Sequence, residues 1–375
     1  ETIAFSLGAN YNKRDGYVRD VALNRDVNDR NRYGIRGQLL FEPSSDFSIR
    51  LIGDYDKIDE NCCGVVNVIN GPTGAIIGAL GGNLDRQNPF SYRVYNNLLS
   101  SNKIDNYGGS GEINYNLGNG LSLTSITSYR KVKADTDQDS DFTSADLIGH
   151  NAQQLDIGTF TQELRVASDF DGPINFLAGG FFFDERIKQA NQINFGASFR
   201  PYGDQLIRAA SGNALNVVLL ENTFGALEGN PAKYQNAFFR RGDGLNENYR
   251  LHDRSFSLFG TVDFEVTDSF TLTGGLNYTD DRKNFSTNVT SSDVFAGINL
   301  DAPAYAPFRN TLLYQGGLAQ QIGGLLGLGR SATATEIGAF AGANPAGFAA
   351  VSAGVQAFAN ANQNNAAANP LAGLR

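Results

Sequence analysis

The stretch at residues 255–279, SFSLFGTVDFEVTDSFTLTGGLNYT, decides the fold. Apolar residues and glycine alternate with polar residues in both halves, and the polar segment 267–269 separates them. The apolar positions are Phe256, Leu258, Gly260, Val262, Phe264 and Val266, then Phe270, Leu272, Gly274, Leu276 and Tyr278. Two runs with a period of two around a short polar turn predict an antiparallel hairpin.

Aromatic residues mark both ends of the apolar face in each arm of this hairpin. They stand eight residues apart, at Phe256 and Phe264 and again at Phe270 and Tyr278. Eight residues of strand span about 27 Å, or about 20 Å of height when the strand is tilted near 40°. This height approaches that of the apolar band of an outer-membrane barrel with its aromatic girdles. The spacing therefore favours a strand pair that crosses a membrane.

The rest of the chain repeats the pattern and predicts nine strands. Connections after even-numbered strands are short, at 43–46, 118–120, 171–173 and 267–269, and those after odd-numbered strands are long. Tyrosines dominate the long-loop ends of the apolar faces and phenylalanines the short-turn ends. The sequence therefore predicts an all-β fold, an antiparallel transmembrane β-barrel segment with short periplasmic turns and long extracellular loops. A large soluble β-sandwich or solenoid is the alternative.

Two regions follow from this assignment. We expect residues 1–283 to form the barrel wall with its loops. Residues 284–375 are expected to form a long extracellular loop rich in Ala, Asn and Gly with short helices, and an unstructured loop is the alternative. Nine strands cannot close an even-numbered barrel, and open sheet edges in lipid leave backbone groups unpaired. We therefore expect the segment to belong to a larger barrel. The facing of strand 174–188 stays open because Phe181, Phe182 and Phe183 are consecutive.

Composition narrows the function classes. The net charge of −9 argues against a nucleic-acid partner. The sequence contains no uninterrupted run of 18 apolar residues, so we expect no transmembrane helix. The chain contains no Met and no secretory signal segment, so we expect it to be processed or cut from something longer.

Several stretches resemble the barrel of TonB-dependent outer-membrane receptors, namely TQELRVAS at 161–168, SLFG at 257–260 and GGLNYTDDR at 274–282. The resemblance implies a plugged barrel of about 22 strands in the outer membrane of a Gram-negative bacterium. It also implies import of a scarce nutrient, of the ferric siderophore, cobalamin or glycan class, driven by the TonB complex acting through a plug domain that this sequence lacks. Membrane lipid and a small-molecule or metal-chelate substrate would be its other partners. We expect no enzyme activity. A passive porin-like channel and a surface-exposed binding or adhesion barrel remain alternatives.

Two short motifs suggest local chemistry. Cys62 and Cys63 are adjacent in the second long loop, where a strained vicinal disulfide, free thiols or pairing elsewhere are all open. The run Asp135, Asp137, Asp139 and Asp141, with Asp146 at the twelfth position, has the carboxylate spacing of a calcium loop. Ser140 replaces the turn glycine, so an acidic, solvated loop is the alternative. No other cofactor is expected.

Further candidates depend on the register and on the loops. Under the predicted register a set of charged residues points into the lumen, where it would contact either the plug or water. This set contains Arg36, Arg50, Glu112, Glu163, Arg165, Asp263 and Glu265. Tyr202, Tyr234, Arg240 and Arg241 are candidate substrate contacts because they are amphipathic and predicted in a loop. His150 and His252 are expected as solvated loop residues.

Overall fold

The computed structural model describes residues 2–84, 88, 90–211 and 213–368 and confirms the antiparallel sheet. Within these residues nine strands form one sheet in the order β1-β4-β5-β7-β8-β9-β10-β11-β12. Their bounds are β1 Ile3–Arg14, β4 Arg30–Ser44, β5 Phe47–Glu60, β7 Ser101–Gly118, β8 Leu121–Asp137, β9 Ile148–Ser168, β10 Ile174–Phe195, β11 Gly244–Thr267 and β12 Phe270–Ser291. Because the order is linear, β1 and β12 are the edges of this sheet.

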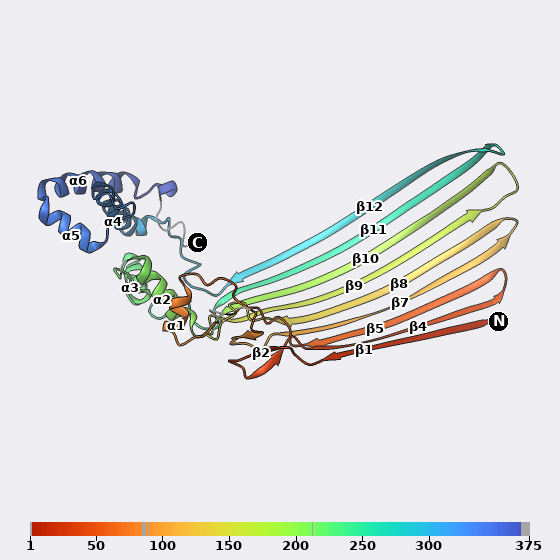
Figure 1. Cartoon of the computed structure of the whole chain (residues 1–375). Coiled ribbons are helices and arrows are strands. Elements are labelled where there is room, and N and C mark those ends of the chain that lie inside the picture. The colour runs from red at the N-terminus through yellow and green to blue at the C-terminus, as the bar shows by residue number, and fades with distance from the viewer. Residues whose placement is uncertain (1, 85–87, 89, 212, 369–375) are drawn as a thin grey trace. The chain divides into compact units, whose positions relative to one another are not determined.

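The connections follow the predicted alternation of short and long. Figure 1 shows the short turns and the start of β1 at one end of the sheet and the long loops at the other. The β7–β8 turn uses three consecutive residues with positive φ, Gly118 at 80°, Asn119 at 53° and Gly120 at 74°. A side chain at Gly120 would also meet the carbonyl oxygen of Asp169, so glycine is required there on two grounds.

The large sheet has no hydrophobic core of its own. Among the described residues, none of the buried hydrophobic side chains belongs to its nine strands. Apolar side chains of one face are exposed instead, with Phe5 82%, Leu7 70% and Leu276 88% accessible. A soluble sandwich would bury this face against a second sheet. The arrangement therefore disagrees with the sandwich alternative.

The register assigns the consecutive phenylalanines of β10 to opposite faces. Phe182 lies opposite Phe256 of β11, on the apolar face, whereas Phe181 lies opposite Ser257. The next hairpin keeps the same facing, because the Ser257 and Thr279 hydroxyls lie 2.9 Å apart and hydrogen-bond across the two strands. Alternation thus continues unbroken through β10, β11 and β12.

The strands extend well beyond the predicted apolar segments. β8 continues to Asp137, β9 begins at Ile148 and β12 continues to Ser291. The prediction of loops around His150 and His252 is therefore wrong, since both residues lie in strands. Above the apolar band both faces of a strand are polar, so no hydrophobic alternation marks it, while the backbone ladder continues.

Shorter elements occupy the long loops beside the sheet. A three-stranded sheet contains β2 Val18–Asp20, β3 Arg25–Val27 and β6 Arg93–Val94, and α1 spans Gly74–Ala79. Val18, Val27 and Val94 form a small core within this sheet.

The chain divides into two compact units, and the second comprises Phe195–Asp243 and Ser291–Arg375. This unit is helical, so the wall ends near residue 290 rather than at 283. Its helices are α2 Phe199–Ala210, α3 Val217–Leu227, η1 Pro303–Tyr305, α4 Ala306–Leu325, α5 Ala334–Ala343, α6 Pro345–Asn362 and η2 Ala366–Ala368. Phe224 and Phe238 are fully buried in its main core. No helix in the described part of the chain is long and apolar enough to span a membrane.

Candidate functional site

The outer, apolar face of the sheet ends in a row of tyrosines on the long-loop side. The rings of Tyr33 and Tyr55 have centroids 6.0 Å apart, and those of Tyr55 and Tyr107 are 6.3 Å apart. The Tyr55 hydroxyl donates a hydrogen bond to Asp105 at 2.6 Å, on the loop side of the row. At the turn end Phe47 packs against Tyr115 at 5.9 Å. Aromatic rings with a polar tip at the edge of an apolar band suit a membrane interface.

The opposite, inner face carries the charged residues predicted to face the lumen. Alternation along each strand puts all seven on this face, namely Arg36, Arg50, Glu112, Glu163, Arg165, Asp263 and Glu265. The Arg165 guanidinium lies 3.2 Å from Glu163, and Thr273 donates to Asp263 at 2.6 Å. Arg50 stands opposite Glu112 in the register. The inner face is therefore lined with charged and hydrogen-bonding side chains.

A denser network on this face centres on Asp54. The Arg130 guanidinium donates to both Asp54 oxygens, at 2.8 and 2.9 Å, and to Asn106 at 2.8 Å. Arg36 approaches the same carboxylate at 3.7 Å. Gly108 lies between Asp54 and Arg130 in the register, and a side chain there would come within 3.3 Å of the guanidinium carbon. The glycine lets Arg130 reach across a strand.

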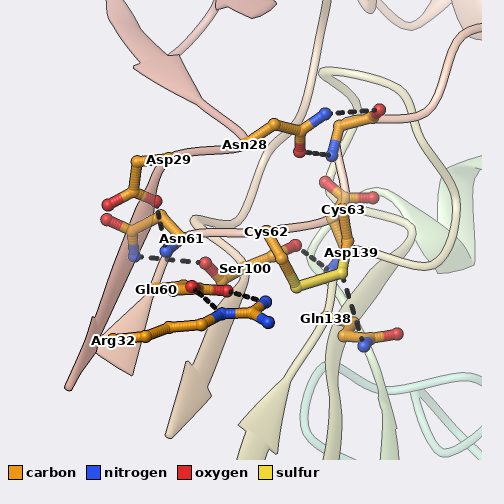
Figure 2. Close-up of a disulfide and its surroundings, with 11 residues drawn as sticks. Asn28, Asp29, Arg32, Glu60, Asn61, Cys62, Cys63, Ser100, Gln138 and Asp139 are labelled. Carbon is orange, nitrogen blue, oxygen red and sulfur yellow. Dashed lines mark hydrogen bonds and ion pairs between the residues drawn. A yellow bond between two sulfur atoms is a disulfide. The ribbon is translucent and has the colours of Figure 1, made fainter. Parts of the chain in front are cut away.

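Figure 2 shows Cys62 and Cys63 joined by a disulfide where three loop segments meet. Their sulfurs are 2.10 Å apart and their Cα atoms 3.7 Å apart. The Gly64 amide donates to the Asn28 side chain at 2.8 Å, and the Gln138 side-chain amide lies 3.6 Å from the Cys63 sulfur. The pair therefore lies at the junction of the loops that follow β1, β5 and β8.

Asp139 fixes this junction from the β8 side. Its carboxylate is fully buried and accepts hydrogen bonds from the backbone amides of Asn97 at 2.8 Å, Leu98 at 3.3 Å and Phe142 at 2.8 Å. Burial, together with the charge of Asp141, raises the pKa of Asp139 to about 6, against the opposing effect of the amides. Asp139 is thus an anchor of the loop.

The five aspartates with calcium-loop spacing do not converge on one point. Asp135 and Asp137 belong to β8, and Asp137 lies 2.7 Å from the His150 ring. Asp141 accepts from the backbone amides of Leu147 and Ile148. Among the residues that the structure describes, no group of three or more His, Cys, Asp or Glu side chains could hold a metal ion. Asp137, Asp139 and Asp141 accept hydrogen bonds from backbone amides instead, so these three carboxylates hold the loop together.

The four proposed substrate contacts all lie in the helical unit rather than in an irregular loop. Tyr234 is buried, and its hydroxyl donates to Glu228 at 2.9 Å, so it is a core residue and not a free contact. Tyr202, in α2, is half-buried, and Arg240 pairs with Asp243 at 2.9 Å. Arg241 is exposed.

A buried ion pair organises the same unit. Arg200 of α2 donates to both Glu221 oxygens, at 2.6 and 2.9 Å. Burial alone would raise the pKa of Glu221, but Arg200 and the backbone amide of Phe238 outweigh it and hold the pKa below its ordinary value. Sequence reasoning missed this pair, because neither residue belongs to a recognisable motif.

Sequence reasoning also missed the partners of Arg36. Asp54 lies on the polar side of the predicted strand 47–55, whereas Arg130 follows Tyr129, so extending the alternation past the tyrosine row would have found it. Their convergence depends on the register between β5, β7 and β8, which no local pattern reveals.

Comparisons with known proteins give matches among solved structures alone. No protein-family model and no curated protein matches the chain. Among solved structures it is similar to the ferric yersiniabactin uptake receptor FyuA of Yersinia pestis, with 9% identity, 77% of this chain and 38% of that chain covered, and a TM-score of 0.46. It is also similar to the ferric-catecholate import receptor Fiu of E. coli K12, with 15% identity. That match covers 78% of this chain and 41% of that chain, with a TM-score of 0.42. The siderophore receptor PiuA of Acinetobacter baumannii shares 15% identity. That match covers 77% of this chain and 43% of that chain, with a TM-score of 0.40. The chain spans less than half the length of each of these receptors.

Proposed function

We propose that this chain is a wall segment of a TonB-dependent receptor in the outer membrane of a Gram-negative bacterium. The observation that carries the proposal is the exposed apolar face of the nine-stranded sheet, bounded by Tyr33, Tyr55 and Tyr107 on the long-loop side. Water would oppose so large an exposed apolar patch, whereas lipid would cover it. Both edge strands would then pair with further strands, because lipid cannot satisfy their backbone groups.

The polar inner face of the sheet supports passage of a polar solute between this face and a plug domain. Its carboxylates and guanidinium groups are arranged for hydrogen bonding, with Asp54 already shared by Arg36 and Arg130. In an intact receptor these groups would contact a plug domain, and the loops at the other end of the strands would capture substrate. The sequence resemblance supplies the substrate class, which is a ferric siderophore, cobalamin or a glycan. We propose no catalytic role for the chain.

Energised uptake separates this proposal from a passive channel. Cells of the native host would be loaded with a radiolabelled ferric chelate, with and without a protonophore, in the presence and absence of this gene. Saturable uptake that needs both the gene and the proton gradient supports the proposal, and cobalamin and an oligosaccharide would be tested in the same way. Gene-dependent uptake that is linear in concentration and insensitive to the protonophore would instead assign a porin-like channel.

Adhesion is the remaining alternative and has a distinct result. Gene-dependent attachment of cells to a surface, without gene-dependent uptake of any of the three solute classes, would overturn the transporter proposal. The variant Arg130→Met, which removes both hydrogen bonds from Arg130 to Asp54, separates uptake from attachment. It should alter uptake without altering attachment.

A further inference from the structure

A groove on the outer face of the sheet lies just beyond the tyrosine row on the long-loop side. It has a volume of about 630 Å³ and crosses β7 to β11. Four cations line it, Lys103, Lys133, Lys188 and Arg250.

The register places these cations on the same face as the apolar band. On β8, Lys133 lies two residues beyond Lys131, which stands opposite Tyr107 of the tyrosine row. On β7, Lys103 lies four residues before Tyr107. Lys188 stands opposite Arg250, and each is six residues from the facing pair Phe182 and Phe256. Because faces alternate with a period of two, an even spacing keeps all four on the outer face.

The acidic residues of the groove already have partners. Asp156 forms an ion pair with Lys131, and Asp105 accepts from the Tyr55 hydroxyl and lies 4.0 Å from Lys57. Asp135 accepts a hydrogen bond from Gln154 at 3.4 Å. Within the described part of the chain, none of the four groove cations forms an ion pair or a side-chain hydrogen bond.

The position of the groove along the strands indicates which ligand could neutralise the charge of its four cations. Four residues of strand beyond Tyr107 correspond to about 13 Å of strand, or about 10 Å of height after tilting. Lipid headgroups occupy the layer directly beyond the apolar band, and long cationic side chains reach back toward it. The groove is thus continuous with the lipid-facing band rather than with the inner face.

We propose that this groove binds the phosphate of a membrane lipid headgroup in the leaflet at the long-loop end of the strands. The inference rests on the proposed membrane orientation but is independent of transport. Lys133 and Lys188, on β8 and β10, would donate to one phosphate from either side of β9, and Lys103 and Arg250 would extend the site to a second. Ammonium and guanidinium donors form strong charge-assisted hydrogen bonds with phosphate oxygens.

The test measures lipid binding by the protein purified from outer membranes in detergent and stripped of lipid. Short-chain phosphatidic acid, with phosphatidylcholine as the uncharged reference, would be titrated and counted by native mass spectrometry. We expect phosphatidic acid to bind in preference to phosphatidylcholine. Lys133→Gln/Lys188→Gln should weaken phosphatidic acid binding about tenfold, since two charge-assisted contacts are removed. The variant Lys133→Arg/Lys188→Arg should keep it.

The matched control is Arg25→Gln/Arg93→Gln, which removes the same charge from exposed positions outside the groove. It should bind phosphatidic acid like the parent protein. Equal binding by the groove variant, equal loss in the control, or complete competition by 10-fold molar inorganic phosphate would each overturn the proposal. An acidic peptide that displaces the lipid at equal concentration would reassign the groove to a protein partner.

Folding and transport are read separately. Heat-modifiable gel migration shows whether each variant keeps its sheet. If the glutamine variant fails this check, the parent protein is tested in 0.5 M salt instead, where screening should abolish its binding of phosphatidic acid. Binding that does not change with salt would then overturn the proposal. Lipid binding intact with energised uptake absent would sink the proposed function alone, and the reverse result would sink this inference alone.

Discussion

Replacing Asp139 by asparagine tests whether the loop junction depends on a carboxylate with two accepting oxygens. One oxygen accepts from Asn97 and Leu98, at 2.8 and 3.3 Å, and the other accepts from Phe142 at 2.8 Å. The asparagine amide keeps one oxygen and turns an N–H₂ donor toward the remaining backbone N–H. A buried donor left without an acceptor costs about 1–3 kcal/mol.

The middle of that range, about 2 kcal/mol, corresponds to roughly 30-fold in an equilibrium constant. Hydrogen exchange of peptides covering 93–100 and 138–148, followed by mass spectrometry, reports local opening of the junction. We expect roughly 30-fold faster exchange there and no change in β11 or β12. Asp135→Asn is the matched control, because Asp135 accepts only a 3.4 Å bond from Gln154. Unchanged exchange at 93–100 in Asp139→Asn would refute the anchoring role.

Three further predictions concern pH, the helical unit and the register. Although burial raises it, Arg200 and the Phe238 amide hold the pKa of Glu221 below its ordinary 4.5. The helical unit should therefore keep its full stability above pH 4.5 and lose stability as the pH falls further, a trend that thermal unfolding followed by circular dichroism measures and that Glu221→Gln should lack. Arg200→Met leaves buried Glu221 with only backbone donors and should destabilise the helical unit by about 3 kcal/mol, read by circular dichroism during heating; a loss below about 0.5 kcal/mol would contradict a structural pair. Cysteines introduced at Thr261 and Thr273 should react with a water-soluble maleimide, whereas those at Val262 and Leu272 should be protected by lipid, and the reverse pattern would overturn the register.

The hairpin at 255–279 shows how far a sequence pattern reaches. Alternation predicted its two faces, and the hydrogen bonds between Ser257 and Thr279 and between Asp263 and Thr273 lie on the predicted polar face. The pattern works there because one face is apolar and the other is not. At Phe181–Phe183 both faces are aromatic, so only pairing with β11 decides the facing.

The loop-end region was less predictable for a physical reason. Beyond the apolar band, residues such as Asp253 and Arg254 are charged on both faces of β11, and the strand is maintained by its backbone ladder. Local aspartate spacing suggested a metal loop, but the fold uses Asp139 and Asp141 to bind backbone amides. The helical unit joins two segments far apart in sequence, so its core contacts, such as that between Tyr305 and Glu228, have no local signature.

The disulfide between Cys62 and Cys63 has a consequence for biogenesis. Joining neighbouring residues encloses no intervening chain, so the bond restricts almost nothing of the unfolded ensemble that a long-range cross-link would restrict. The sulfurs can therefore be oxidised before any strand has found its neighbour. Both cysteines of the chain are used in this way, so no free thiol remains among the residues that the structure describes. Strand assembly and oxidation are thus separable steps, and neither has to wait for the other.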